Sequence, residues 1–268
     1  MLVFPNAKIN LGLNIVAKRA DGYHDIESCL YPIPWYDALE VIPSDKTNFT
    51  QTGLTIDGKS EDNLCLKAYR LLKEDLKIPS VDIHLHKVIP MGAGLGGGSA
   101  DGAFMLKLLN SLFDLGLSIQ QLEAYAAQLG SDCPFFIKNI PSIATGRGTD
   151  LSPVDLDLSA LWIGIKYPQV HVSTKEAYAG VTPKRPEKTI ADILRGPVTS
   201  WQGSLLNDFQ LGIVSKQPLV GKALRSIVED EPVFGAMSGS GAAVFGLFNE
   251  APNPEAYDLV EKLILSAN

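Results

Sequence analysis

The sequence predicts an α+β protein that forms one large or two small domains. Three observations support this prediction: 46% of the 268 residues are hydrophobic, segments with strand and helix patterns alternate loosely, and the pattern changes near residue 150. A chain of this length and composition can bury a sizeable core. We therefore expect an N-terminal domain over residues 1–150 and a C-terminal domain over residues 151–268, packed as an α+β arrangement.

The charge balance and the cysteines narrow the class of protein. The formal net charge is −7, and no basic block of the kind that binds nucleic acid is present. Three widely spaced cysteines without a C-x-x-C pair are typical of reduced thiols in a cytoplasmic protein. The first residues lack a signal-peptide pattern, and no apolar run is long enough to span a membrane. We expect a cytoplasmic protein in which any anionic ligand is held by local features.

The first strand is expected over residues 7–16, because apolar residues from Ile9 to Ile15 alternate with polar ones. Lys8 and Asn10 share the polar face and therefore point away from the core. For a strand lysine, contact with solvent is the most common situation.

The turn after this strand holds two ring side chains. Asp21-Gly22 has turn composition. The next residues, Tyr23 and His24, could stack on a flat ligand and hydrogen-bond to it. An aromatic ring folded over the turn is an equally good interpretation.

Local patterns give the other elements of the first half. We expect strands over 26–33, 37–42 and 81–88, a hairpin around Gly53 over 47–58, and a helix that starts after residues 61–63.

Two later helices carry recognisable start signals. Ser118 and Gln121 fit a capping box for a helix that ends at Gly130. Pro134 suits the first turn of the following helix, which makes an N-cap the simplest role for Asp132.

The most informative segment runs from Pro90 to Asp101 and has glycine at five of the seven positions 92–98. Such a segment has no apolar face, and its N–H groups can approach a ligand closely. A strand pattern precedes it, and a helix pattern from Ala103 to Phe113 follows it. This order presents free N–H groups and the positive end of a helix dipole to an anion, most often a phosphate.

Two widespread phosphate loops do not fit this segment. Gly92, Gly94 and Gly97 have the spacing of the dinucleotide fingerprint, but the acidic residue that should close the next strand is replaced by Asp114 within a helix pattern. The Walker A loop needs a lysine before its serine, and none precedes Ser99.

The second half mixes strand and helix patterns. Strands are expected over 161–165 and 242–248, and helices over 174–179, 188–195, 204–215, 219–229 and 254–266. The loop Ser238–Gly241 before the last strand is either a simple hairpin turn or part of a phosphate or substrate site.

The segment from Pro90 to Ser99 closely resembles the ATP loop of the GHMP superfamily of small-molecule kinases. Four further segments agree with this superfamily in order and spacing: 7–11, 19–24, 130–136 and 238–241. Within it, the pattern is most similar to the branch that acts on 4-diphosphocytidyl-2-C-methyl-D-erythritol, in the non-mevalonate route to isoprenoid precursors. Small departures at Asn6, Ser131 and Cys133 lie beside the matched catalytic positions.

The resemblance implies roles for residues at matching positions. Asp132 corresponds to the catalytic carboxylate, and Lys8 to the lysine paired with it. The substrate-binding residues implied in the same way are Asn10, Tyr23, His24, Thr174, Tyr178, Gly239, Ser240 and Gly241. Of these, Tyr23 and Tyr178 are expected to hold the cytosine ring between them.

The ATP site is implied in the same way. Its residues are Pro90, Met91, Gly92, Ala93, Gly94, Leu95, Gly96, Gly97, Gly98, Ser99 and Ala100, with Asn63 and Lys87 beside the adenine. Mg²⁺ is the implied metal, and Ser99 is a candidate ligand.

The resemblance also implies a fold and a reaction. The expected fold is the two-domain GHMP kinase fold, with an N-terminal ribosomal S5 domain 2-like part, a C-terminal ferredoxin-like α/β sandwich, and the active site in the cleft between them. A monomer or weak homodimer would phosphorylate the 2-hydroxyl of the cytidylyl substrate, with Asp132 as general base and Lys8 as its electrostatic partner.

Three alternatives remain at this stage. One is another GHMP kinase that acts on mevalonate, homoserine or a sugar, although such substrates carry no base for Tyr23 and His24 to stack on. A dinucleotide-binding oxidoreductase and a non-catalytic nucleotide sensor are the others.

Overall fold

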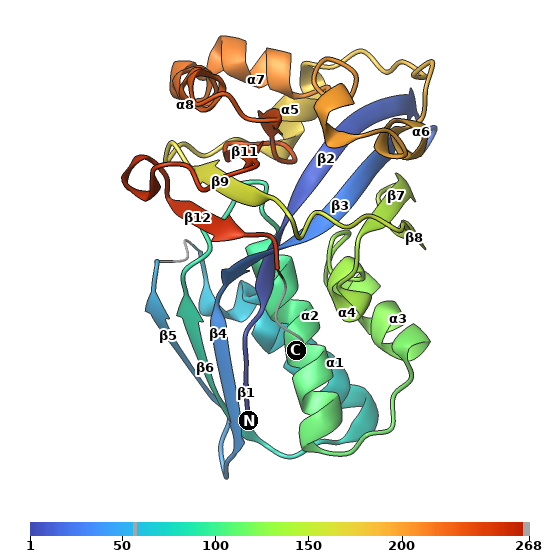
Figure 1. Ribbon diagram of the computed structural model, residues 1–268. Coiled ribbons are helices and arrows are strands. Elements are labelled where there is room, and N and C mark those ends of the chain that lie inside the picture. The colour runs from blue at the N-terminus through green and yellow to red at the C-terminus, as the bar shows by residue number, and fades with distance from the viewer. Residues whose placement is uncertain (56–57, 265–268) are drawn as a thin grey trace.

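The computed structural model describes residues 1–55 and 58–264. Within this part of the chain, the strands form three four-stranded sheets with helices packed around them (Figure 1). The arrangement confirms the α+β prediction.

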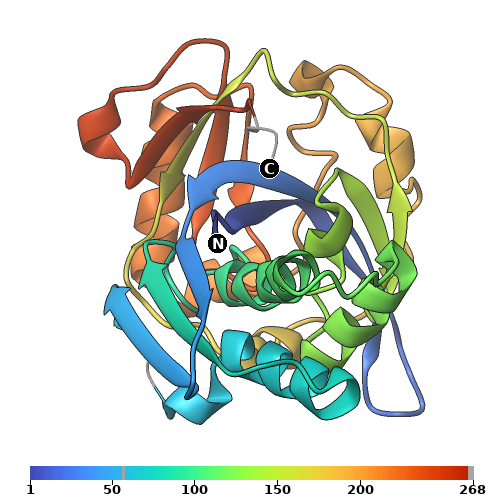
Figure 2. The ribbon, with the colours of Figure 1, turned by 90° about the horizontal axis from the view of Figure 1, so that it is seen from below.

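The first sheet lies in the N-terminal half and has the order β1-β4-β6-β5. Its strands are β1 (Leu2–Val3), β4 (Ala38–Pro43), β5 (Asn48–Gly53) and β6 (Val81–Lys87). Helices α1 (Leu64–Leu76) and α2 (Gly97–Leu112) lie beside this sheet, followed by α3 (Ile119–Leu129) and α4 (Phe135–Lys138). Seen from below, α2 is central, with the sheet on one side and α3 and α4 on the other (Figure 2).

The second sheet is dominated by two long antiparallel strands, β2 (Asn6–Lys18) and β3 (His24–Tyr36). It has the order β2-β3-β7-β8, with β7 (Ser142–Gly146) and β8 (Asp150–Pro153). The domain boundary expected between residues 150 and 151 falls inside β8, and it stays a prediction.

The third sheet belongs to the C-terminal half and has the order β10-β11-β9-β12. Its strands are β9 (Trp162–Lys166), β10 (Phe234–Met237), β11 (Val244–Phe248) and β12 (Leu259–Lys262). The α-helices of this half are α5 (Thr174–Ala179), α6 (Ile190–Leu194), α7 (Gln210–Lys216) and α8 (Pro218–Glu229). Short 3₁₀ turns lie at Ser60–Asp62, Val198–Ser200 and Pro254–Ala256.

Several local predictions are confirmed. Asn63 caps α1 by accepting a bond from Cys65 N at 2.9 Å, and Ser118 forms the expected capping box with Gln121 at the start of α3. These caps satisfy backbone donors that a helix start would otherwise leave unpaired.

Two predictions are wrong because tertiary pairing outweighs the local pattern. The expected hairpin over 47–58 is absent, since β5 pairs in parallel with β6; residues 56–57 lie outside the described part. The helix expected over 254–266 is replaced by a 3₁₀ turn and by β12, which pairs with the edge of β9; residues 265–266 are not described.

The environment of Lys8 and Asn10 also differs from expectation. Neither side chain is solvated, because the glycine-rich loop and the segment around Ser238 cover this end of β2. The helix expected over 204–215 begins only at Gln210, because the side chain of Asn207 bonds to Met237 O, Gly239 O and Phe209 N.

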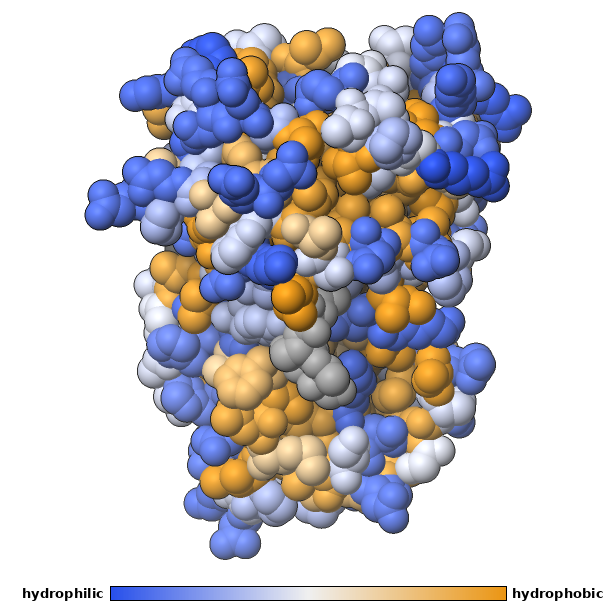
Figure 3. Space-filling model, viewed as in Figure 1, coloured by the Kyte–Doolittle hydropathy of each residue, from blue (hydrophilic) through white to orange (hydrophobic). Residues whose placement is uncertain are grey.

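On the face seen in Figure 1, hydrophilic side chains crowd the upper corners and apolar side chains appear between them (Figure 3). Mixed apolar and polar exposure of this kind is normal for a protein surface. Among the described residues, no helix combines the length and apolar character that a membrane crossing needs.

Candidate active site

Residues from both halves of the chain line one cleft of about 910 Å³. The glycine-rich loop forms one wall, and residues of β2, β3 and the turn between them form another. The second half contributes residues 171–175, Tyr178, Gly239 and Ser240. Neither half forms this cleft alone.

The glycine-rich loop is fixed through its carbonyl groups. The carbonyl oxygens of residues 93, 94 and 95 accept bonds of 2.8–3.0 Å from Ala243 N, Ser238 Oγ and Lys8 N, in that order. Gly94 has φ of 80°, and a Cβ there would lie 2.1 Å from Ser238 O, so only glycine fits. With these acceptors turned toward the protein, the loop is well suited to offer N–H donors to an anion.

The start of α2 is open to a ligand. Its N-cap is Gly96, which makes no side-chain capping bond. The first N–H groups of a helix have no partner within the helix. They and the helix dipole therefore favour an anion in the cleft at this point.

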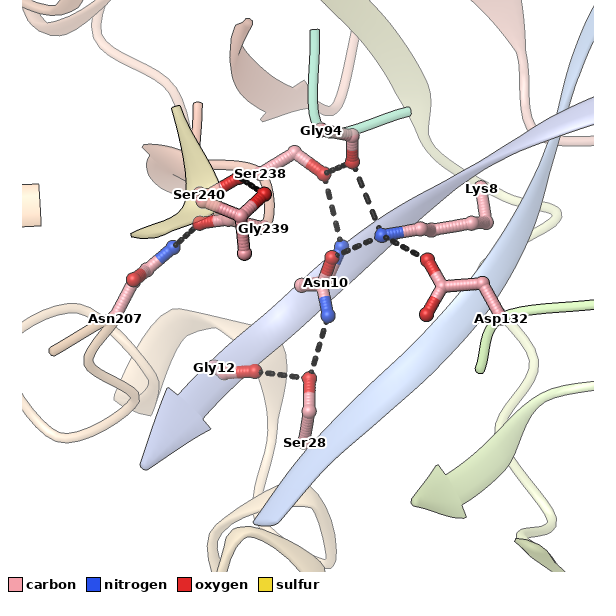
Figure 4. A network of polar contacts seen from close by, with 11 residues as sticks. Lys8, Asn10, Gly12, Ser28, Gly94, Asp132, Asn207, Ser238, Gly239 and Ser240 are labelled. Carbon is pink, nitrogen blue, oxygen red and sulfur yellow. Dashed lines mark hydrogen bonds and ion pairs between the residues drawn. The ribbon is translucent and has the colours of Figure 1, made fainter. Parts of the chain in front are cut away.

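Lys8 lies at the floor of the cleft, and only 3% of it is exposed. Its Nζ donates to Asn10 Oδ1 at 2.6 Å and to Gly94 O at 3.0 Å, and it lies 3.5 Å from Asp132 Oδ2 (Figure 4). The side chain of Asp132 is 41% exposed, so the carboxylate is accessible to a substrate. Lys8 and Asp132 therefore form an ion pair at the base of the cleft.

Ser28 fixes the orientation of the Asn10 amide. Ser28 Oγ donates to Gly12 O at 2.6 Å, because a carbonyl oxygen can only accept. The hydroxyl oxygen therefore accepts the bond of 2.8 Å from Asn10 Nδ2, and this leaves Oδ1 for Lys8 (Figure 4). Asn10 N in turn donates to Ser238 Oγ at 3.2 Å. The chain of bonds holds the Lys8 ammonium in place.

Asp132 is not a helix cap. The N-cap of α4 is Pro134, without a side-chain capping bond, so the N-cap interpretation is wrong. The neighbouring thiol of Cys133 is buried, and burial raises its pKa to about 12 despite a hydrogen bond with Ser99. A thiol with such a pKa is unreactive near neutral pH.

Ring side chains gather at another part of the cleft. His24 and Tyr178 stack with centroids 4.8 Å apart, and Phe209 contacts the edge of Tyr178. The ring of Tyr23 instead carries the guanidinium of Arg147 on one face, at 3.6 Å from its centroid. Both Tyr23 and Tyr178 line the cleft, and the expected placement of the cytosine between them stays a prediction. Burial and the charge of Asp132 both raise the pKa of Tyr178.

Lys87, expected beside the adenine, points into the protein and lines no part of the cleft. Its Nζ pairs with Asp37 Oδ2 and, at 2.9 Å, with Asp101 Oδ2, and both carboxylates are buried. Asp37 Oδ1 also accepts bonds from Val88 N (2.6 Å) and Ile89 N (2.9 Å), just before the glycine-rich loop. This buried triad therefore supports the loop from beneath.

Burial shapes the protonation of the triad. It raises the pKa of Asp101 to about 7, against the opposing effect of Lys87. Burial would lower the pKa of Lys87, but the two carboxylates outweigh it and the pKa is raised. Within the described residues, Asp101 Oδ1 is a buried atom without a hydrogen-bond partner.

Comparisons with known proteins agree with this geometry. Residues 63–139 match the family model of the GHMP kinases N terminal domain. The chain is 51% identical to the 4-diphosphocytidyl-2-C-methyl-D-erythritol kinase of Parabacteroides distasonis, over 93% of this chain and 92% of that protein. It is 50% identical to the kinase of the same name from Cytophaga hutchinsonii, over 94% of each chain.

The chain belongs to the 4-diphosphocytidyl-2-C-methyl-D-erythritol kinase family.

Solved structures support the same assignment. A crystal structure of 4-(cytidine 5'-diphospho)-2C-methyl-D-erythritol kinase has a TM-score of 0.79 and 30% identity, covering 96% of this chain and 92% of that one. A mevalonate kinase has a TM-score of 0.71 with 14% identity, covering 96% and 92%, and this likeness concerns the fold alone. The fold is thus the two-domain GHMP kinase fold, and the chain is an ATP-dependent kinase.

Most residues that the resemblance to this family singled out lie together in the cleft. The predicted residues that line it are Lys8, Asn10, Tyr23, His24, Pro90, Met91, Gly92, Ala93, Gly94, Gly96, Gly97, Gly98, Ser99, Asp132, Thr174, Tyr178, Gly239 and Ser240. Leu95 and Ala100 are buried in the core, and Gly241 does not line the cleft. Asn63 lines a separate hollow of about 260 Å³, together with Met91 and Gly98.

Sequence reasoning missed residues that line the cleft and residues that support it. Ser28 and Asn207 do not line the cleft; they hydrogen-bond to the lining residues Asn10 and Gly239, which no local pattern reveals. Arg147 and His171 come from a turn and an irregular segment, yet both line the cleft. The sequence offered one hint of a role for Arg147: its charged side chain lies between two glycines, in Gly146-Arg147-Gly148.

Proposed function

We propose that this chain transfers the γ-phosphoryl group of ATP to the 2-hydroxyl of 4-diphosphocytidyl-2-C-methyl-D-erythritol. The observation that carries the proposal is the pair of Lys8 and Asp132 at the floor of a cleft with a glycine-rich loop on one side. The names of the relatives support the choice of acceptor. The ring side chains of the cleft supply a surface on which a nucleobase can stack.

The phosphates of ATP are assigned to the glycine-rich loop and the start of α2. The loop carbonyls are engaged by the protein, and no side chain caps the helix, so both elements suit an anion. The hollow beside Asn63 is assigned to the adenine. Asn63 Oδ1 bonds to Cys65 N, which leaves its NH₂ group as the donor for the ring.

Asp132 acts as the general base in this proposal. Its carboxylate accepts the proton of the acceptor hydroxyl while the oxygen forms a bond to the γ-phosphorus, and the bond to the bridging oxygen of ADP breaks. Positioned bases typically contribute about 10²- to 10⁴-fold to rate. The Lys8 ammonium stabilises the carboxylate and the charge on the transferring group.

The residues present fit a magnesium ion held mainly by the nucleotide. The described residues contain no group of three or more His, Cys, Asp or Glu side chains placed for a metal. Mg²⁺ usually binds one or two protein oxygens together with substrate phosphates and water. Ser99, in the cleft, would supply such an oxygen, and the ion would neutralise charge on the phosphates.

The acceptor is assigned to the opposite end of the cleft. Asn10, Thr174 and Ser240 provide polar groups for the methylerythritol diphosphate part, and Thr174 Oγ1 lies 3.4 Å from Ser240 Oγ. The cytosine is assigned to Tyr23, His24 and Tyr178. We also propose a cytoplasmic location and a monomer or weak homodimer.

A substrate panel tests the proposal. ADP release is measured for the purified chain with ATP, Mg²⁺ and either the cytidylyl alcohol, mevalonate or homoserine. We expect turnover with the cytidylyl alcohol and at most a trace with the others. Faster turnover with mevalonate or homoserine would instead support another GHMP kinase activity.

A further inference from the structure

We propose that Arg147 is a positioning residue for the base-binding end of the cleft. Its guanidinium backs one face of the Tyr23 ring and keeps the other face in place for the nucleobase of the acceptor. This inference rests on the proposed function, because it assumes a base-carrying substrate.

The guanidinium of Arg147 lies close over the ring of Tyr23. Arg147 Cζ lies 3.6 Å from the centroid of the Tyr23 ring, well inside the range of a cation–π interaction. A planar guanidinium stacks on an aromatic ring in a way that a lysine ammonium cannot. An aromatic ring has two faces, so a base that stacks on Tyr23 takes the face opposite the guanidinium.

Tyr23 needs such support. The residue is 53% exposed and lies in the turn between β2 and β3. The backbone of this turn is held by the bond from Tyr23 N to Asp21 Oδ1, at 3.1 Å. That bond fixes the main chain but leaves the ring free to rotate. Ordering such a side chain only when the substrate arrives would weaken binding.

The backbone around Arg147 is held by hydrogen bonds and strand pairing. It occupies the tight turn between β7 and β8, closed by the bond from Gly148 N to Thr145 O at 2.9 Å. Its neighbour Gly146 pairs with Ile26 on β3, close to Tyr23 along the chain. The turn that carries the guanidinium is thus tied to the strand that begins next to the ring.

The charge of Arg147 is available to the ring. Arg19 in the same region is paired with Asp21 and Asp25, at 3.1 and 2.8 Å. Within the described part of the chain, Arg147 makes no ion pair of this kind. The hydrogen bond from Tyr23 N lowers the pKa of Asp21, and the charges of Arg19 and Arg147 act in the same direction. The negative charge of Asp21 is therefore present near the guanidinium and helps to hold it.

Steady-state kinetics test the inference. We compare wild type with Arg147→Ala and Arg147→Lys, and use Arg195→Ala as a control that removes an exposed arginine paired with Asp192 outside the cleft. Arg147→Ala should raise KM for the cytidylyl substrate about fivefold, while kcat and KM for ATP stay within about twofold. Arg147→Lys should recover only part of the loss, and Arg195→Ala should resemble wild type.

A double-mutant cycle identifies the route of the effect. If Arg147 acts through Tyr23, the variant with both Tyr23→Ala and Arg147→Ala should match Tyr23→Ala alone. Tyr23→Phe keeps the ring and should keep the response to Arg147→Ala. Fully additive effects, or an unchanged or lowered KM in Arg147→Ala, would overturn the inference.

Calorimetry with cytidine 5′-diphosphate provides a readout without turnover. Arg147→Ala should weaken its binding by about the same factor, fivefold. Wild-type binding in the variant would contradict the inference even if the kinase activity is as proposed. Conversely, wild type that releases no ADP with the cytidylyl substrate contradicts the proposed function, whatever Arg147 does.

Discussion

Two lysines lie beneath the same glycine-rich loop and are buried to almost the same degree. Lys8 is 3% exposed and Lys87 is 1% exposed. The carboxylate beside Lys8, that of Asp132, opens into the cleft, whereas both carboxylates beside Lys87 are buried. Burial of the lysine therefore does not identify the functional one. The exposure of Asp132, the anionic partner of Lys8, instead favours our proposal that Lys8 is the functional lysine.

The two ammonium groups also differ in what they face. The ammonium of Lys8 is aimed by Asn10 and Gly94 at a carboxylate that substrates can reach. The ammonium of Lys87 lies against the start of α2, since a Cβ added to Gly97 would come within 2.9 Å of Lys87 Nζ. In the proposed mechanism Lys8 faces the reacting groups, whereas the triad of Lys87 supports the loop.

The largest expected effect is on turnover. Lys8→Met or Asp132→Asn should lower kcat about 10²- to 10⁴-fold, because each removes a group that the proposed mechanism places at the reacting atoms. The thermal midpoint should fall less than in Lys87→Met, since the carboxylate beside Lys8 is solvated, whereas both carboxylates beside Lys87 are buried. ADP-release kinetics and thermal unfolding measure the two quantities. Near-normal kcat in either variant would exclude that residue from the mechanism.

The second effect is on stability: a Lys87 variant should lose stability more than turnover, the opposite of a Lys8 variant. Lys87→Met leaves two buried carboxylates without their cation and should lower the free energy of unfolding by about 3–5 kcal/mol. Turnover per folded molecule should fall far less than in Lys8→Met. Denaturant unfolding checks the first statement, and kinetics below the transition check the second. If Lys87→Met were as stable as wild type but inactive, Lys87 would take part in the reaction, and the distinction between the two lysines would be wrong.

The third effect is a pH dependence of stability. Burial raises the pKa of Asp101 to about 7, whereas an unfolded aspartate titrates near ~3.9. Between these values the folded state binds the extra proton, so this group makes the protein less stable as pH rises from about 4 to about 7. Asp101→Asn should remove up to ~1.4 kcal/mol per pH unit of that slope.

Denaturant unfolding at several pH values measures this slope, with Asp157→Asn as an exposed control whose pKa is lowered by bonds from Ser159. An unchanged slope in Asp101→Asn would show that Asp101 stays ionised throughout and that the triad is permanently charged.

The smallest effect concerns the orientation of Asn10. Ser28→Ala removes the hydroxyl that accepts from Asn10 Nδ2, so the amide can turn and weaken its hold on Lys8. We expect kcat to fall about fivefold, the value of one hydrogen bond, with KM for ATP unchanged. Ser28→Thr keeps the hydroxyl and should recover the rate. Equal losses in both variants would point to packing instead.

The sequence correctly predicted those features that depend on residues close together in the chain. The glycine-rich turn between strand and helix, the Asn63 cap and the Ser118 capping box are set by neighbouring residues. The family resemblance added residues from both halves that line the cleft, including Lys8, Asp132 and Thr174.

The features that sequence reasoning missed depend on contacts between distant segments. The sequence pattern predicts a helix over 254–266, but Leu259 and Val260 lie in β12, because β9 offers an edge to pair with. Lys87 looked like a ligand-binding residue, and only the approach of Asp37 from 50 positions away shows that its ammonium is occupied. The role proposed for Arg147 depends on its contact with the ring of Tyr23, more than one hundred residues earlier in the sequence.

The most direct test of the central claim follows the phosphoryl group itself. Phosphorus NMR of a reaction with ATP, Mg²⁺ and the cytidylyl alcohol should show a new phosphomonoester with wild type. Asp132→Asn, verified by calorimetry to bind both substrates, should show almost none over the same time. Formation of that product by Asp132→Asn at the wild-type rate would contradict the assignment of this cleft as the site of proton removal and phosphoryl transfer.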